Sequence, residues 1–504
     1  MNSNSHTTNH YYFLLLLACA AALFLSEQSH AQQPNPHSMI LGLTRVTSDL
    51  STPKSAAITR VKKSSESLDV MEPLREVRDG YLISLNLGTP PQIFQVYMDT
   101  GSDLTWVPCG NISFDCLDCD DYKNNKILGS FSPSRSSSSY RDSCASSFCV
   151  NVHSSDNGFD TCAAAGCPLG ALLKGTCLRP CPSFAYTYGD GVVSGTLTRD
   201  FLRVHGSSPN SSRDVPKFCF GCVGATYREP IGIAGFGKGP LSIPSQLGFL
   251  QKGFSHCFLA FRFANNPNVS SPLVVGDVAI SSKDDLQFTP MLNSPAYPNY
   301  YYIGLEAITI GGSGAGAGGP GDSTNAAVTV TQVPLSMRNF DSSGNGGMLI
   351  DSGTTYTHLP EPLYSQLLSS LQSTIHFPRA KEAEMRTGFD LCYHVPCRSN
   401  ATAGPGGDDD VSLPSITFHF LNNATLVLPQ ENHFYAMSAP TNSTQVKCLL
   451  FQSMDGAGAG DQYGGPAGIF GSFQQQNVEV VYDLEKERIG FRTTDCALQG
   501  LHNN

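Results

Sequence analysis

The chain has 504 residues, of which 40% are hydrophobic and 14% are charged, and its formal net charge is −11. This length exceeds that of one ordinary compact core, so we expect two lobes. The many glycines and prolines, together with few charges, favour a loop-rich, strand-dominated globular protein over a coiled coil or a disordered chain. The acidic balance, with no basic stripe to neutralise phosphates, argues against nucleic acid as a partner.

Residues 1–31 have the pattern of a secretory signal peptide. Tyr11–Leu25 is an apolar run of 15 residues, which is short for a membrane span, and it leads to Ser29-His30-Ala31, a small-x-small pattern suited to signal peptidase. No Lys or Arg precedes the run, so an uncleaved anchor is the alternative interpretation. We expect a secreted protein, extracellular or in the cell wall with the vacuole as the alternative, which has no membrane attachment after signal cleavage.

Residues 32–79 are polar and comparatively basic, with little sustained periodicity. One interpretation is a flexible N-terminal extension. The other is a prosegment that is removed to give a mature start near Asp79 and whose cations cover an acidic site until then. These cations are Arg45, Lys54, Arg60, Lys62, Lys63, Arg75 and Arg78.

From Tyr81 onward, strand patterns dominate and lead to a first acidic turn. Tyr81–Leu87 alternates between polar and apolar residues and stops at Gly88-Thr-Pro-Pro, which predicts a strand followed by a turn. Ile93–Met98 predicts a second strand, and it ends at Asp99-Thr-Gly-Ser. A short apolar-x-Gly element, Ile233-Ala-Gly235, follows later.

A second copy of this order occurs in the other half of the chain. Tyr301–Ile310 resembles the Tyr81 strand and also ends in Gly, and Gly347–Ile350 then leads into Asp351-Ser-Gly-Thr. Ile469-Phe-Gly471 supplies the second apolar-x-Gly element. Such duplication predicts two related β lobes about a pseudo-twofold axis, with a junction near Pro290–Asn299. Three glycine-rich stretches, residues 311–321, 404–410 and 456–465, are expected to be surface insertions.

Sixteen of the 17 cysteines lie outside the signal segment, an even number that is compatible with full pairing. Cys116-Leu-Asp-Cys119 and Cys219-Phe-Gly-Cys222 could each be a zinc or redox pair, but an oxidising compartment favours disulfides. Nine cysteines fall within residues 109–181. Six Asn-x-Ser/Thr acceptors fit glycosylated surface loops: Asn111, Asn210, Asn268, Asn400, Asn423 and Asn442.

The two acidic turns together predict a hydrolytic site. Gly after Asp permits close backbone approach, and neighbouring N–H groups can donate to the carboxylate. Two such turns across a twofold axis bring Asp99 and Asp351 together, and like charges about 3 Å apart cannot both ionise, so the pair holds one proton. One carboxylate then acts as base on a shared water while its protonated partner polarises the carbonyl of a peptide bond. Ser102 and Thr354 can orient the carboxylates by hydrogen bonds.

From Tyr81 to Cys496 these motifs resemble the pepsin-like aspartic proteases. The stretches FAYTYG (Phe184–Gly189) and GSFQQQNV (Gly471–Val478) are similar to the atypical, nepenthesin-like plant branch. The resemblance implies an all-β, bilobal fold: a first lobe over residues 80–293 with a cysteine-rich insertion at 109–181, and a second lobe over residues 294–504. It also implies a monomer that cuts peptide or protein substrates at acidic pH without cofactor or metal.

The resemblance also implies roles for individual residues. Asp99 and Asp351 match the catalytic pair, Tyr188 and Gly189 the flap over the substrate, and Trp106 the residue that braces that tyrosine. Ser352 replaces the commoner Thr but keeps the hydroxyl used between the lobes. The supporting turn residues are Thr100, Gly101, Ser102, Ser352, Gly353 and Thr354. By resemblance, Cys257–Cys496 and Cys392–Cys448 are plausible disulfides.

Three other interpretations compete with an active protease. The first is a catalytically silent protein of the same fold, such as a xylanase-inhibitor-like or receptor-like binding module. The second, nucleotide binding by Gly232–Gly239, lacks the Gly-x-Gly-x-x-Gly order, and a glycine-rich turn after a buried strand explains the stretch better. The third, a Ser-His-Asp hydrolase, lacks a Gly-x-Ser-x-Gly elbow, so His256 and His358 are expected to be scaffold residues.

Overall fold

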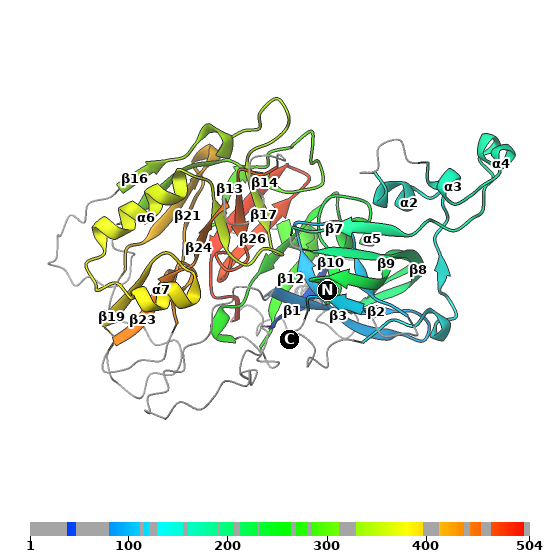
Figure 1. Cartoon of the computed structure of the whole chain (residues 1–504), viewed down its shortest axis with the longest axis horizontal. Helices are drawn as coiled ribbons and strands as arrows, with labels where there is room; N and C mark the ends of the chain where they lie inside the picture. Colours follow the sequence, from blue (N-terminus) through cyan, green and yellow to red (C-terminus); the bar gives the residue numbers. More distant parts are fainter. Residues whose placement is uncertain are drawn as a thin grey trace, which may run out of the picture.

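Strands dominate this computed structural model and form two lobes, as expected (Figure 1). In Figure 1 the first lobe, blue to green, and the second, mainly yellow and orange, lie on either side of β26 and β13. The structure describes residues 38–46, 80–110, 115–119, 129–154, 160–189, 191–205, 212–229, 231–263, 269–280, 285–311, 329–396, 413–437, 444–454 and 465–497. The signal segment lies outside these residues.

The first lobe consists of strands with short helices in its cysteine-rich insertion. Its strands are β2 (Gly80–Leu87), β3 (Gln92–Asp99), β4 (Trp106–Pro108), β5 (Asp115–Leu117), β6 (Tyr140–Arg141), β7 (Phe184–Thr187), β8 (Val192–His205), β9 (Ser212–Tyr227), β10 (Ile233–Gly235), β11 (Gly253–Cys257) and β12 (Ser271–Gly276). Its helices are α2 (Ser147–Val152), α3 (Thr161–Ala164), α4 (Leu169–Lys174) and α5 (Ile243–Leu247). In Figure 1, α3 and α4 project from the edge of this lobe.

The second lobe contains the longest helix of the described chain, α6 (Leu363–Thr374), which buries Leu363, Leu367 and Leu371 on one face at four-residue spacing. The other helix is α7 (Lys381–Thr387). β13 (Gln287–Pro290) precedes residue 294 and pairs with β27. The strands after residue 294 are β14 (Tyr302–Ile303), β15 (Leu305–Ile310), β16 (Thr329–Gln332), β17 (Met348–Asp351), β18 (Thr357–Leu359), β19 (Cys392–Pro396), β20 (Ile416–Phe420), β21 (Thr425–Val427), β22 (Phe434–Ala436), β23 (Thr444–Leu449), β24 (Phe451–Ser453), β25 (Gly468–Gly471), β26 (Val478–Asp483) and β27 (Arg488–Thr493).

One sheet joins the lobes. Its order runs β13-β27-β26-β11-β12-β1-β2-β3-β10-β4-β9-β8-β6, in which β1 is Ser38–Val46. The strands β26 and β27, from near the end of the described chain, therefore join the first lobe through β11. Phe254 on β11 stacks on Tyr482 of β26 with ring centroids 4.3 Å apart. The disulfide Cys257–Cys496, expected from the family resemblance, closes the same junction and is confirmed, as is Cys392–Cys448.

A strand lies inside the basic N-terminal segment, where a flexible extension was one of the two interpretations. β1 (Ser38–Val46) pairs with β12 through Ser38–Leu43 and with β2 through Thr44–Val46. Leu41 and Leu43 are 3% and 0% exposed. The interpretation as a flexible extension is therefore wrong for Ser38–Val46, because this short apolar stretch fills a gap in the sheet between β2 and β12.

The duplicated pattern predicted from the sequence has the same register in both lobes. β10 pairs in parallel with β3 so that Gly235 faces Asp99, and β25 pairs in parallel with β17 so that Gly471 faces Asp351. One expectation fails: Tyr301–Ile310 is interrupted between β14 and β15. A Cβ at Gly304 would lie 2.5 Å from the Leu421 side chain, so a remote contact leaves room only for glycine at the interruption.

The described helices include none that combines the length and apolar character needed to cross a membrane.

Candidate active site

The two acidic turns have matching internal hydrogen bonds. In the first, the Gly101 N–H donates to Asp99 Oδ1 at 2.9 Å and the Ser102 hydroxyl donates to Asp99 Oδ2 at 2.5 Å. In the second, the Gly353 N–H donates to Asp351 Oδ1 at 2.8 Å and the Thr354 hydroxyl to Asp351 Oδ2 at 2.5 Å. Each carboxylate is therefore held by one backbone and one hydroxyl donor, as required for a fixed orientation.

A reciprocal set of hydrogen bonds ties the two turns to each other. The Thr100 N–H donates to Ser352 Oγ at 2.9 Å, and the Ser352 N–H donates to Thr100 Oγ1 at 3.0 Å. The two hydroxyls continue across the interface: Thr100 donates to the Ile350 carbonyl at 3.1 Å, and Ser352 donates to the Met98 carbonyl at 2.9 Å. Thr100 and Ser352 are 0% and 1% exposed, so water cannot replace these bonds.

The geometry of the glycines shows that the two carboxyl groups meet. A Cβ built on Gly101 would lie 2.6 Å from the Asp351 Cγ, so Asp351 packs on the first turn. A Cβ built on Gly353 would collide with Asp99 Oδ1 and lie 3.2 Å from Asp351 Oδ1. Both carboxylates therefore face one small volume that only glycine leaves open, and this is why Gly follows the hydroxyl residue in each turn.

The apolar-x-Gly elements hydrogen-bond to threonines that follow the two acidic turns. The Gly235 N–H donates to Thr105 Oγ1 at 3.2 Å, and the Gly471 N–H donates to Thr357 Oγ1 at 3.1 Å. Thr105 and Thr357 each lie six residues after the Asp of their own turn. The internal symmetry thus extends beyond the acidic motifs to the strands that position them.

A hairpin carries the residues assigned to the flap. β7 pairs with β8 from Phe184–Gly195 to Thr187–Val192, and the Tyr188 N–H donates to the Gly191 carbonyl at 2.7 Å. The Trp106 indole N–H donates to the Tyr188 hydroxyl at 2.9 Å. Trp106 is fully buried and Tyr188 is 8% exposed, and Gly189 occupies the turn. The contact predicted between this tryptophan and this tyrosine is present.

Three side chains near the site were not predicted from the sequence. Asp103 is 6% exposed, and burial raises its pKa to about 6. Burial also raises the pKa of Tyr300 to about 12, with the charges of Asp103, Asp99 and Asp351 adding to the shift. Burial also raises the pKa of Tyr186, with Tyr300 and the charges of Asp103 and Asp99 adding to the shift. For Asp103 the available sequence signal was its position directly after Asp99-Thr-Gly-Ser.

Neither Cys-x-x-Cys pair is a metal site in this structure. Cys116 and Cys119 form a disulfide, and Cys222 pairs with Cys109. The expectation of full pairing is wrong at Cys219, which is a buried thiol, and Cys397 lies outside the described residues. The insertion also contains the disulfides Cys144–Cys162, Cys149–Cys181 and Cys167–Cys177.

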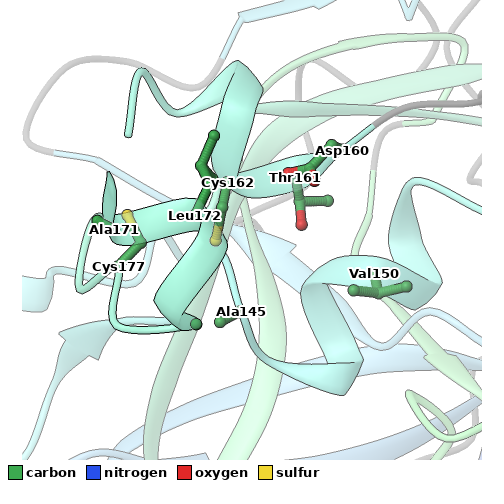
Figure 2. Close-up of a pocket in the computed structure, with 9 residues that line it drawn as sticks. Ala145, Val150, Asp160, Thr161, Cys162, Ala171, Leu172 and Cys177 are labelled. Atoms are coloured by element: carbon green, nitrogen blue, oxygen red, sulfur yellow. The ribbon is translucent and has the colours of Figure 1, made fainter. Parts of the chain in front are cut away.

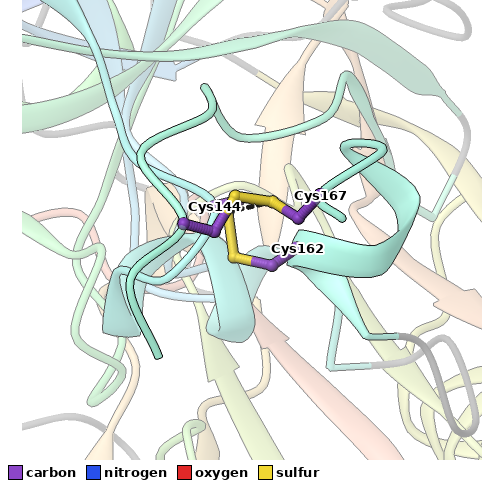
Figure 3. Close-up of side chains that lie close together, drawn as sticks. Cys144, Cys162 and Cys167 are labelled. Atoms are coloured by element: carbon purple, nitrogen blue, oxygen red, sulfur yellow. Dashed lines mark hydrogen bonds between the residues drawn. A yellow bond between two sulfur atoms is a disulfide. The ribbon is translucent and has the colours of Figure 1, made fainter. Parts of the chain in front are cut away.

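Two of these disulfides lie against each other, with Cys144 Sγ 3.9 Å from Cys167 Sγ (Figure 3). All four sulfurs lie within 4.8 Å of one another, but they are paired covalently and so are not metal ligands in this state. A pocket of about 320 Å³ adjoins them and is lined by Val150, Asp160 and Leu172 among others (Figure 2). Its lining contains none of the predicted site residues.

Of the six glycosylation acceptors, Asn423 is the one within the described residues. It is exposed and lies in a short 3-10 turn, Leu421–Asn423. Asn111, Asn210, Asn268, Asn400 and Asn442 lie outside the described residues.

Comparisons with known proteins agree with this architecture. A family model described as xylanase inhibitor N-terminal matches residues 81–277, and one described as xylanase inhibitor C-terminal matches residues 300–493. The chain is 33% identical over 452 residues to a protein of Arabidopsis thaliana named probable aspartyl protease At4g16563, covering 83% of this chain and 82% of that one. It is 30% identical to aspartic proteinase nepenthesin-2 of Nepenthes gracilis, covering 83% and 78%.

Solved structures show the same fold. Basic 7S globulin from soybean has a TM-score of 0.56 at 19% identity, covering 92% of this chain and 98% of that chain. Conglutin gamma from lupine seeds has a TM-score of 0.55 at 17% identity, covering 92% and 99%. Two strand-rich lobes with mirrored Asp turns define a pepsin-like protein. The chain belongs to the pepsin-like aspartic protease family, in the plant group that includes the nepenthesins.

Proposed function

We propose that this protein is a secreted aspartic endopeptidase that hydrolyses peptide bonds at acidic pH. The observation that carries the proposal is the convergence of Asp99 and Asp351 on one small volume, each with a hydroxyl and a backbone donor. The names of the relatives at about 30% identity are consistent with it.

The mechanism follows from the geometry of the pair. Because two adjacent carboxylates cannot both ionise, the pair carries one proton between them at acidic pH. The ionised member takes a proton from the shared water as the water attacks the scissile carbonyl carbon. The protonated member donates to the carbonyl oxygen, and the tetrahedral intermediate then collapses as the leaving nitrogen takes up a proton. Thr100 and Ser352 keep the two carboxylates in register through the interface.

The flap role of Tyr188 and Gly189 belongs to the same proposal. The Tyr188 hydroxyl accepts the Trp106 indole N–H at 2.9 Å, which fixes the tyrosine ring directly after β7 of the β7–β8 hairpin. A hairpin held in this way can cover an extended peptide and exclude water from the reacting bond. The peptide or protein substrate would then lie between the hairpin and the Asp pair.

Secretion, the removal of a prosegment, glycosylation and a monomeric state are parts of the proposal carried by the sequence. If the prosegment covers the site, the secreted chain is a zymogen whose N-terminus changes on activation. N-terminal sequencing of the active protein tests this point, and an active protein whose sole N-terminus is Gln32 would contradict it.

Cleavage by the purified, matured protein tests the function. Denatured protein substrate should be cut between about pH 3 and 6 in a pepstatin-sensitive manner. Asp99→Asn and Asp351→Asn should each remove at least about 1,000-fold of the rate, because one carboxylate cannot both activate water and polarise the carbonyl. Asp285→Asn, which removes an exposed carboxylate, is the matched control and should retain the wild-type rate.

A catalytically silent binding protein of the same fold is the second candidate. The observation that favours it is the description of both matching family models as xylanase inhibitor. Under this candidate the wild-type protein shows no turnover over the whole acidic range, and the two Asp→Asn variants are indistinguishable from it.

A further inference from the structure

A third carboxyl group lies beside the first acidic turn and connects three elements. Asp103 follows Ser102 and is 6% exposed. Its Oδ1 accepts the Gly239 N–H at 2.7 Å, and its carboxyl group also hydrogen-bonds the Asn299 side chain. Gly239 belongs to the loop after β10, whereas Asn299 belongs to the segment that leads into β14 of the second lobe. Asp103 therefore contacts the elements on both sides of the lobe junction.

The glycine-rich stretch after β10 fits around this carboxyl group. A Cβ built on Gly237 would collide with Asp103 Oδ1 and lie 2.9 Å from the Asn299 carbonyl oxygen. A Cβ built on Gly239 would lie 2.5 Å from Asp103 Cγ. Side chains at these positions would push the carboxyl group out, so the spacing of these glycines is explained by the Asp103 side chain.

The backbone of the same loop holds the first acidic turn. The Phe236 N–H donates to the Asp99 carbonyl at 2.7 Å, and the Gly237 N–H donates to the Ser102 carbonyl at 2.9 Å. The Lys238 N–H points the other way and donates to the Asn299 carbonyl at 2.7 Å. The loop is thus bonded both to the acidic turn and to the segment that leads into the second lobe, and Asp103 contacts both partners.

The second acidic turn has no such carboxyl group. Thr355 occupies the position four residues after Asp351, as Asp103 does after Asp99. Its carbonyl accepts the Phe473 N–H at 2.9 Å, so the backbone support is similar but the titratable side chain is missing. The asymmetry shows that the fold does not require an acidic residue at this position.

The charge state of Asp103 depends on its surroundings. Burial disfavours the ionised form and is opposed by the Gly239 and Asn299 hydrogen bonds, while the negative charge of Asp99 disfavours it further. Lys238 favours the ionised form, but burial lowers the pKa of Lys238 itself. The titratable groups that face Asp103 are Asp99 on the turn, Lys238 on the loop, Tyr186 on β7, and Tyr300 and Tyr301 before β14.

We propose that Asp103 is a positioning residue whose carboxyl group, which accepts the Gly239 N–H and hydrogen-bonds Asn299, holds the first acidic turn against loop 235–239 and the segment that leads into the second lobe. Asp103 does not touch the reacting atoms and acts through the placement of Asp99. Its effect on cleavage rests on the proposed function, whereas its effect on the fold does not.

Two substitutions at Asp103 separate the charge from the contact. Asp103→Asn keeps an oxygen acceptor for the Gly239 N–H but cannot ionise, whereas Asp103→Ala removes the contact. Rates on a peptide substrate should be measured from about pH 3 to 8 as kcat and KM. Asp103→Ala should lower kcat at pH 4 at least about tenfold with little change in KM, and Asp103→Asn should restore most of this loss.

The thermal midpoint over the same pH range makes the test independent of catalysis. The wild-type midpoint should fall more steeply than that of Asp103→Asn as the pH rises from about 4 to 7, because only the wild type must ionise a buried carboxyl group. Asp285→Asn should follow the wild type in every measurement. At pH 4 the thermal midpoint of Asp103→Ala should lie below the midpoints of the wild type and of Asp103→Asn, and equal midpoints in all three would overturn the proposal. If the wild type shows no cleavage, the proposed function fails while this comparison still decides the role of Asp103.

Discussion

The interlocked bonds between the two turns predict a specific cost for removing one hydroxyl group. Thr100→Val keeps the shape of the side chain but removes Oγ1, which accepts the Ser352 N–H and donates to the Ile350 carbonyl. Both backbone groups are then left in a site that is closed to water. A buried group without a partner costs about 1–3 kcal/mol, so the substitution should lower the free energy of unfolding by about 2–6 kcal/mol.

Thr289→Val is the matched control. Thr289 is also 0% exposed, and within the described residues its Oγ1 has no hydrogen-bond partner. The same chemical change at Thr289 should be neutral or slightly stabilising, because it removes a hydroxyl whose burial cost is not offset by a hydrogen bond. The difference between the two variants therefore measures the bonds of Thr100 rather than the loss of a hydroxyl in general.

Urea unfolding of both variants at about pH 5 gives the measurement. A lower midpoint with an unchanged m-value reports a loss of stability in the native state. Thr100→Val should also lower kcat more than it raises KM, because the carboxylates of Asp99 and Asp351 are then no longer held in a fixed relative position. Equal stability of Thr100→Val and Thr289→Val, within about 0.5 kcal/mol, would refute the argument that these bonds fix the site.

Three further predictions concern the flap, the pH dependence and the N-terminal strand. Tyr188→Phe removes the hydroxyl that accepts the Trp106 N–H. It should lower kcat/KM about 5–30-fold, equivalent to about 1–2 kcal/mol, without unfolding the protein. Unchanged kinetics would contradict the flap assignment. Folding raises the pKa of Asp103 from 3.8 to about 6, so its contribution to stability is complete below about pH 4 and is lost as the pH rises through 6. The free energy of unfolding should therefore fall by about 3 kcal/mol. Chemical unfolding at pH 4 and 7 should show this loss in the wild type and not in Asp103→Asn. After a cut within residues 47–79, the strand Ser38–Val46 should remain bound under native conditions and be released by denaturant, and mass spectrometry can detect both. Loss of the strand without a fall in the thermal midpoint would contradict its place between β2 and β12.

The elements that carry the duplicated pattern could be predicted from the sequence because their signals are local. β3 and β17 each end at the Asp that was expected to terminate them, and β10 and β25 contain the two apolar-x-Gly elements. An apolar run that stops at an acidic turn is visible within about ten residues of sequence. Its occurrence twice in the same order made the pairing of the turns predictable as well.

Features that depend on contacts between distant segments could not be predicted. β1 was hidden because the basic character of residues 32–79 outweighed its few apolar residues, whose partners on β12 lie far along the chain. The close approach of Leu421 to Gly304, where the expected strand is interrupted, is one such contact. The role of the glycines in loop 235–239 depends on Asp103, which lies against them in the fold. The free thiol of Cys219 could not be predicted because it depends on Cys222 pairing with Cys109.

Neutron diffraction from crystals grown at acidic pH would test the central claim most directly. The account predicts one deuterium shared by the carboxyl groups of Asp99 and Asp351, with a single solvent molecule in hydrogen-bonding contact with both. A carboxyl pair too far apart for one solvent molecule to reach both, or two fully ionised carboxylates at the pH where cleavage is fastest, would contradict it.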